Sequence, residues 1–128
     1  IELTNIYLWK NENLESNDIN LYQLLAHSDA LITDYSSVGA DYLLVDKPLA
    51  YVRDDIDEYS AKRGFCFEDI EKMSPGSKIK NKQDFINFID DIVNNKDQYK
   101  KERKWVRDFY HKYQKGNSSK VLSDYFDL

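Results

Sequence analysis

The sequence has 128 residues, of which 41% are hydrophobic and 14% aromatic, enough for one hydrophobic core in a single folded unit. Its formal net charge of -5 argues against a broad basic surface for nucleic acid. The chain has only four Gly and two Pro, which excludes a linker-like or low-complexity segment. A single cysteine, Cys66, cannot form an internal disulfide, so we expect a small buried apolar side chain there.

The start of the chain and its hydropathy bear on where the protein works. No charged and then apolar leader opens the sequence, and no uninterrupted apolar run is long enough to span a bilayer. The chain begins at Ile1 without Met. We therefore expect a water-soluble piece of a longer protein, which forms one partial domain over residues 1–128.

The first part of the chain predicts one strand and one helix. Residues 6–9 form a short apolar run between polar residues, which is typical of a strand. Residues 11–17 are expected to form a loop. Asp18 can cap a helix whose apolar residues follow helical spacing, and this helix is expected to end near His27.

The centre of the chain predicts a parallel βαβ unit. Residues 30–33 and 49–52 are short apolar runs typical of buried strands, and apolar residues at helical spacing fill the interval from 38 to 46 before Pro48. A right-handed crossover within one parallel sheet is the economical arrangement. Ligands bind beyond the carboxyl ends of such strands, where the segment 33–37 is expected to lie.

This segment, with Thr33, Ser36 and Ser37, has the features of a phosphate site. The first N–H groups of a helix lack internal partners, and the helix dipole and serine hydroxyls add to the attraction for an anion. Ser36 or Ser37 could equally do no more than cap the helix. Ser37 and Asp41 are four residues apart and share a helix face, so Asp41 would face the ligand of Ser37. A carboxylate beside a phosphate suggests a ligand with polyol hydroxyl groups.

The region after the last of these strands is acidic. Its acids, within residues 53–59, would repel a phosphate unless they bind sugar or polyol hydroxyl groups. Arg63, just before Gly64, could offset them by presenting its planar guanidinium to a phosphate, although a solvated arginine is the simpler interpretation.

The second half of the chain predicts three further helices. Residues 65–67 suggest a short edge strand and 74–77 a turn, and Asn81 or Lys82 opens a covering helix. A second helix is expected over 98–113, within a segment from 96 to 115 where Lys and Arg outnumber the acids. Its basic face is either solvated or in contact with an anionic membrane or polymer. A last helix, capped by Asn117 or Ser118, is expected to pack inward through its apolar residues Val121, Leu122, Tyr125 and Phe126.

Catalytic machinery is not visible in the sequence. Neither His27 nor His111 has an acid or a nucleophile at a recognisable spacing, and the acids are not spaced as metal ligands. A receiver-like signalling module is an alternative, because Asp34 and Lys47 resemble the phosphoacceptor aspartate and the Lys-Pro step of that family. Only one helix separates Asp34 from Lys47, whereas the receiver resemblance needs further βα units between them.

Taken in order, the motifs resemble the C-terminal part of the CDP-glycerol glycerophosphotransferases of teichoic acid synthesis. The resemblance covers roughly residues 21–121 without a motif out of place. It rests on residues 29–38, Asp41, Lys47-Pro48, 55–59, 63–65, 75–76 and 116–119.

The resemblance implies a fold, a site and a reaction. The fold would be α/β, a Rossmann-like parallel sheet forming the C-terminal half-domain of a GT-B type glycosyltransferase. Thr33, Ser36 and Ser37 would lie at the pyrophosphate of CDP-glycerol, and Asp41 near the glycerol hydroxyls. The family transfers glycerol phosphate to a membrane-linked polymer and releases CMP, with no bound metal or other cofactor implied by the motif.

The same resemblance also sets what lies outside the chain. The catalytic base would belong to a missing N-terminal domain, so we expect no catalytic residue here and no turnover by this chain alone. The full-length protein would be cytoplasmic and peripheral at the inner face of the membrane. The alternative is the donor-binding domain of another GT-B capsule or glycan transferase that uses a different nucleotide donor.

Overall fold

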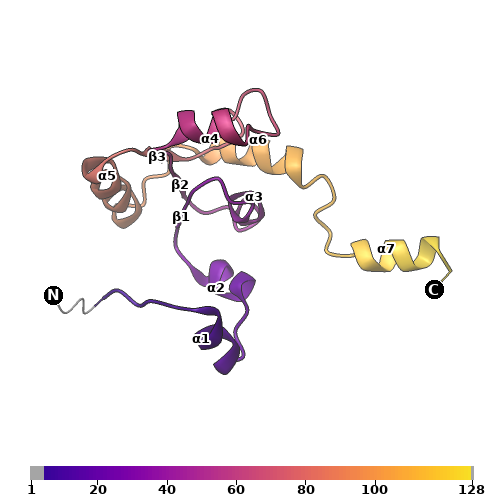
Figure 1. Cartoon of the computed structure of the whole chain (residues 1–128). Helices are drawn as coiled ribbons and strands as arrows, with labels where there is room; N and C mark the ends of the chain where they lie inside the picture. Colours follow the sequence, from indigo (N-terminus) through magenta and orange to yellow (C-terminus); the bar gives the residue numbers. More distant parts are fainter. Residues whose placement is uncertain (1–4, 128) are drawn as a thin grey trace.

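A computed structural model describes residues 5–127 as an α/β fold (Figure 1). Its strands are β1 (Leu31–Thr33), β2 (Leu49–Val52) and β3 (Ser77–Ile79). Its helices are α1 (Asn11–Ser16), α2 (Leu21–His27), α3 (Val38–Tyr42), α4 (Ile56–Lys62), α5 (Lys82–Val93), α6 (Lys100–Tyr110) and α7 (Ser118–Tyr125). None of the helices in this described part of the chain is long and apolar enough to cross a membrane.

The three strands form one parallel sheet in the order β1-β2-β3. Leu31 pairs with Leu49 and Thr33 with Tyr51, so the expected parallel crossover between residues 30–33 and 49–52 is confirmed. The third strand is not predicted from the sequence, and only its first residue, Ser77, falls within the turn expected over 74–77. It escapes prediction because it has only three residues, and two of them, Ser77 and Lys78, are polar.

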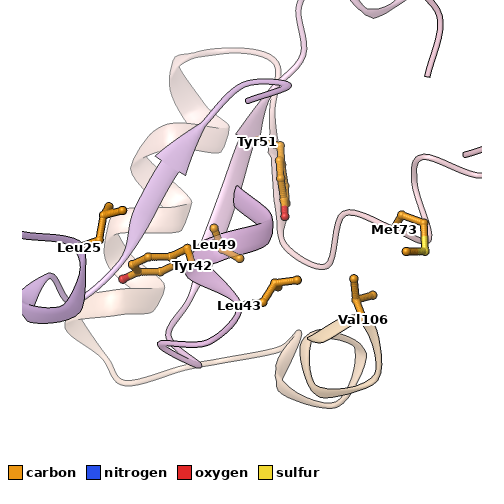
Figure 2. Close-up of a cluster of buried hydrophobic side chains, with 7 residues drawn as sticks. All are labelled: Leu25, Tyr42, Leu43, Leu49, Tyr51, Met73 and Val106. Atoms are coloured by element: carbon orange, nitrogen blue, oxygen red, sulfur yellow. The ribbon is translucent and has the colours of Figure 1, made fainter. Parts of the chain in front are cut away.

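Both faces of the sheet are covered, because successive side chains of a strand point to opposite faces. On one face Leu49 and Tyr51 join a cluster of buried residues from α2, from α3 and the residue after it, from α6 and from the segment before β3: Leu25, Tyr42, Leu43, Val106 and Met73 (Figure 2). On the other face Ala50 packs with Ile79 and with Phe88 of α5. This two-sided burial explains why β2 is a continuous apolar run.

A buried arginine ties α6 to the rest of this core. Arg103 is fully buried, its Nε donates to Oδ1 of Asp46 at 3.0 Å, and its Nη2 donates to Oδ2 of Asp97 at 2.6 Å. Nη1 donates to the second oxygen of Asp97 at 3.0 Å, and Nη2 also reaches the backbone carbonyl of Asp46. These hydrogen bonds hold the pKa of Asp97 below its usual value.

The beginning of the chain differs from the prediction. Residues 6–9 form no strand, and their side chains are exposed, with Leu8 at 83%. The expected loop over 11–17 contains α1. The next helix is capped by Asn20, whose side chain accepts from the backbone N–H of Gln23 at 2.9 Å, whereas Asp18 has a positive φ of 54° and lies outside the helix. Asn20 is better placed because Gln23 completes a capping box.

Three later expectations are corrected. Residues 65–67 form no strand, and Cys66 is exposed, because this segment runs along the surface after α4. The final helix, α7, buries none of its residues, and Figure 1 shows it at the end of an extended segment, away from the sheet. Its apolar side chains therefore do not pack inward as expected.

The start of α5 is confirmed, since the side chain of Asn81 accepts from the N–H groups of Gln83 and Asp84.

Candidate functional site

A cavity of about 470 Å³ lies where β1 and β2 end, on the face of the sheet that carries Tyr51. The loop after β1 forms one wall and the segment between α4 and β3 forms another. The cavity is lined by Asp34, Tyr35, Ser36, Ser37, Gly39, Ala40, Leu43, Tyr51, Arg53, Tyr59, Gly64, Phe65, Cys66, Phe67, Ile70, Met73, Ser74 and Tyr110. Its position is the one where parallel α/β sheets bind ligands.

The loop after β1 is held by its own side chains. The backbone N–H of Ser36 donates to Oδ1 of Asp34 at 2.8 Å, and the N–H of Val38 donates to Oγ of Ser36 at 3.4 Å. Ser37 occupies the N-cap position of α3 but makes no side-chain cap hydrogen bond. Ser36 therefore caps the helix through a long hydrogen bond of 3.4 Å. The Ser37 hydroxyl makes no cap hydrogen bond and is available to a ligand.

Only some of the residues predicted for the site line the cavity. Ser36 and Ser37 line the cavity. Thr33 is half-buried in β1 and does not line it, and Arg63 is exposed just before the lining residue Gly64. Asp41 also lies outside the lining, where its Oδ2 accepts a hydrogen bond from Tyr22 of α2 at 3.4 Å. Ligand binding by all five of these positions stays a prediction.

Three stacked aromatic rings form part of the cavity wall. The ring centroids of Tyr35 and Tyr59 are 4.1 Å apart, and those of Tyr59 and Phe65 are 5.3 Å apart. The Tyr35 hydroxyl donates to Oδ1 of Asp55 at 2.9 Å. Burial, with this hydrogen bond to a carboxylate, raises the pKa of Tyr35 to about 12. Tyr35 is therefore a neutral donor at physiological pH.

A buried arginine, Arg53, lines the same cavity. It follows β2 directly, is 4% exposed, and donates through Nη1 to Oε1 of Glu71 at 3.0 Å and through Nη2 to Oγ of Ser74. Its guanidinium carbon lies 5.1 Å from the centroid of the Tyr51 ring, and burial raises the pKa of Tyr51 to about 12. The sequence predicts Arg53 at the ligand edge of the sheet but not as a ligand-binding residue.

Metal and histidine chemistry is not assembled around the cavity. Within residues 5–127, no group of three or more His, Cys, Asp or Glu side chains is placed to hold a metal ion. His111 ends α6 with its Nε2 2.8 Å from the carbonyl oxygen of Ala40, and Nδ1 of His27 lies 2.8 Å from the carbonyl oxygen of Gln23. Both rings thus contact backbone rather than an acid or a nucleophile.

Comparison with known proteins identifies relatives of this chain. Residues 7–126 match the family model described as CDP-Glycerol:Poly(glycerophosphate) glycerophosphotransferase. The chain is 31% identical to a teichoic acid ribitol-phosphate primase of Bacillus spizizenii, with 93% of this chain and 32% of the relative covered. It is 35% identical to a teichoic acid poly(glycerol phosphate) polymerase of the same organism, with 95% of this chain and 30% of the relative covered.

A solved structure agrees with the sequence relatives. The wall teichoic acid polymerase TagF superposes with a TM-score of 0.71 and 28% identity, over 95% of this chain and 31% of that chain. The expected α/β, Rossmann-like fold of GT-B type is thereby confirmed. The chain spans about a third of the length of the relatives that it matches. It belongs to the CDP-glycerol:poly(glycerophosphate) glycerophosphotransferase family of teichoic acid biosynthesis.

Proposed function

We propose that this chain is the donor-binding part of a transferase that moves a polyol phosphate from a CDP-polyol, CDP-glycerol first among them, to a teichoic-acid-like polymer. The observation that carries the proposal is the cavity at the carboxyl ends of β1 and β2, with Ser36 and Ser37 in its wall. Family membership supports the substrate class. Binding would place the pyrophosphate against the serine hydroxyls and leave the polyol toward the acceptor.

The proposed reaction makes and breaks one bond at phosphorus. The terminal hydroxyl oxygen of the acceptor attacks the phosphorus that carries the polyol, and the bond from that phosphorus to the bridging oxygen breaks. CMP leaves with the electron pair, and the hydroxyl proton passes to a general base. Hydrogen-bond donors around the pyrophosphate assist by stabilising the charge that develops on the departing CMP.

We propose that the general base of this reaction is not part of the cavity. No histidine is among the described residues that line it. The chain spans about a third of its relatives, so we propose that the base lies in a separate segment. The isolated chain should therefore bind nucleotide and release no CMP from CDP-glycerol. If the chain alone releases measurable CMP from CDP-glycerol, this assignment is contradicted.

Nucleotide titration tests the binding proposal directly. We expect CMP and CDP-glycerol to shift the backbone amide resonances of residues 33–41, and a UDP-sugar to leave them in place. Cys66 provides a second readout, because it is the sole cysteine, is exposed and lines the cavity. Saturating CMP should slow its alkylation. Unchanged resonances and an unchanged alkylation rate with every nucleotide would refute donor binding.

The polyol is a separate question from the nucleotide. The relatives include both a ribitol-phosphate primase and a poly(glycerol phosphate) polymerase. Competition between CDP-glycerol and CDP-ribitol for the same amide shifts would rank the two donors. A preference for a UDP-sugar would instead support the alternative, a different capsule or glycan transferase.

We further propose that the full-length protein works at the inner face of the cell membrane, where a lipid-linked polymer would be extended. In α6, Trp105 and Phe109 are about half exposed and lie one turn apart, next to the exposed Lys101 and Lys104. Exposed aromatic and basic side chains on one helix favour an anionic lipid surface. Co-sedimentation with vesicles of phosphatidylglycerol, but not with neutral phosphatidylcholine vesicles, is the expected result.

A further inference from the structure

We propose that Arg53 binds phosphoryl oxygens of the nucleotide donor and is the principal cation of this cavity. The proposal rests on the donor-binding function proposed above and deepens it by naming the residue that recognises the phosphate groups. It starts from the position of Arg53, which directly follows β2 and lines the cavity together with Ser36 and Ser37.

The charge on Arg53 is only partly balanced. Its single carboxylate partner, among the described residues, is Glu71, whose side chain is 57% exposed. Glu71 is shared, because its other oxygen lies 3.5 Å from Nζ of Lys78. Two cations thus share one exposed carboxylate, so Glu71 balances the charge of Arg53 only in part. A buried charge without full compensation is unfavourable, and an incoming anion relieves it.

Asp34 is the one carboxylate among the described residues that line the cavity, and it makes no ion pair with Arg53. Its Oδ1 accepts the hydrogen bond from the backbone N–H of Ser36. Asp55 accepts from the Tyr35 hydroxyl and is not among the lining residues. None of the acids within residues 53–59, which were expected to repel a phosphate, is among the lining residues.

Arg53 also has hydrogen-bonding capacity in reserve. Its Nη1 and Nη2 each have a partner, whereas its Nε is buried and has none among the residues that the structure describes. The guanidinium carbon lies 5.1 Å from the Tyr51 ring centroid and 6.0 Å from that of Tyr35, so aromatic rings hold its plane in place. A fixed, planar and permanently charged donor group suits phosphate better than it suits a neutral hydroxyl.

Arg63, the arginine selected from the sequence, is less well placed for this role. Arg63 is exposed at the end of α4 and does not line the cavity. An exposed arginine contributes little because water screens its charge. The position of Arg53 directly after β2 and its burial make it the stronger candidate.

The test measures the affinity of Arg53 variants of this chain for CMP and for cytidine, which lacks the phosphate, by calorimetry. Removing a charge-assisted hydrogen bond weakens binding by about tenfold or more. We expect Arg53→Gln to lower affinity for CMP by at least about tenfold, with cytidine affinity changed by less than about twofold. The CMP affinity of Arg53→Lys should lie between that of the unmodified chain and that of Arg53→Gln. Lys80→Gln, which removes an exposed charge outside the cavity lining, is the matched control and should bind CMP normally.

The outcomes separate this inference from the donor-binding proposal. If the unmodified chain binds CMP and Arg53→Gln binds it equally well, Arg53 is not a phosphate ligand although the function stands. If the unmodified chain binds no nucleotide, both proposals fail. If Arg53→Gln does not fold, the Nε–H resonance of Arg53 is followed in the unmodified chain. This resonance should shift with CMP and not with cytidine, and any other result would show that the inference is wrong.

Discussion

At the level of single residues, Ser37 separates ligand binding from helix capping. A capping serine contributes about 1 kcal/mol to stability, but Ser37 makes no side-chain cap hydrogen bond. We therefore expect Ser37→Ala to change the free energy of unfolding by less than about 0.5 kcal/mol while weakening CMP binding. Urea denaturation and calorimetry measure the two quantities. Ser36→Ala is the comparison, since Ser36 accepts from the N–H of Val38; a larger stability loss in Ser37→Ala than in Ser36→Ala would contradict the assignment.

Arg103 makes a residue-level prediction about stability. It is fully buried and bridges Asp46 and Asp97 with a planar fork that lysine cannot reproduce. We expect Arg103→Lys to lower the free energy of unfolding by about 2 kcal/mol, because broken buried pairs are strongly destabilising. Arg107→Lys, one turn along on α6 and partly exposed, should lose less than half as much. Equal losses of unfolding free energy in the two variants would show that Arg103 stabilises the fold no more than Arg107 does.

The same network predicts a pH dependence. The hydrogen bonds from Arg103 lower the pKa of Asp97 in the folded chain, so its stabilisation is complete above the unfolded-state pKa of about 3.9 and is lost as the pH falls through the lower, folded-state pKa. The free energy of unfolding should therefore decline with acidification below about pH 4. Asp97→Asn should show a shallower decline than the unmodified chain, and parallel curves would show that other carboxylates dominate.

At the level of elements, the close approach of β2 to the segment before β3 depends on Gly76. A Cβ at this position would lie 2.8 Å from the carbonyl carbon of Leu49 and closer still to its oxygen. Backbone cannot move aside as a side chain can, so Gly76→Ala should destabilise the chain by about 1–3 kcal/mol. Gly39→Ala is the control, since its Cβ would meet side-chain atoms of Thr33 and Tyr51 at 3.3 and 3.4 Å. Thermal denaturation that ranks Gly39→Ala as the more harmful change would contradict this account.

Elements with strong local signals were predictable and those fixed by distant contacts were not. β1 and β2 are apolar runs covered on both faces, and Asn81 caps α5 with its own side chain. By contrast, β3 forms because Ser77 pairs with Ala50 across the sheet, a contact that leaves no local pattern. Residues 6–9 show the converse case: an apolar run resembles a strand, but the described chain offers no neighbouring strand for it to pair with.

The same distinction between local signals and distant contacts applies to the site residues. Ser36 and Ser37 could be selected because a strand, a hydroxyl segment and a helix follow one another in the sequence. Arg53 could not, because its importance arises from burial against Tyr51 and from Glu71 and Ser74, which are distant in sequence. Its place directly after an apolar run was the available signal. Local order thus predicts which edge of the sheet binds ligand, whereas packing decides which charged side chain lies in it.

At the level of the whole molecule, burial is concentrated around the sheet and the two ends of the described chain are exposed. The core residues lie in the strands, in α2, α5 and α6, in α3 or directly after it, or in the segment that leads to β3. The helix α7 buries none of its residues, and Val121, Leu122, Tyr125 and Phe126 are all more than half exposed. Stability should therefore be distributed unevenly along the chain.

Native-state hydrogen exchange measures this distribution. Amides of β2, which pair with both neighbouring strands, should exchange only through global unfolding, whereas amides of α7 and α1 should exchange through local opening at a small fraction of that free energy. Ending the chain at residue 115 should accordingly leave the protection of β2 unchanged, because α7 adds no residue to either core cluster. If truncation lowers the protection of β2, then α7 packs on the sheet in solution and the inward packing expected from the sequence is restored.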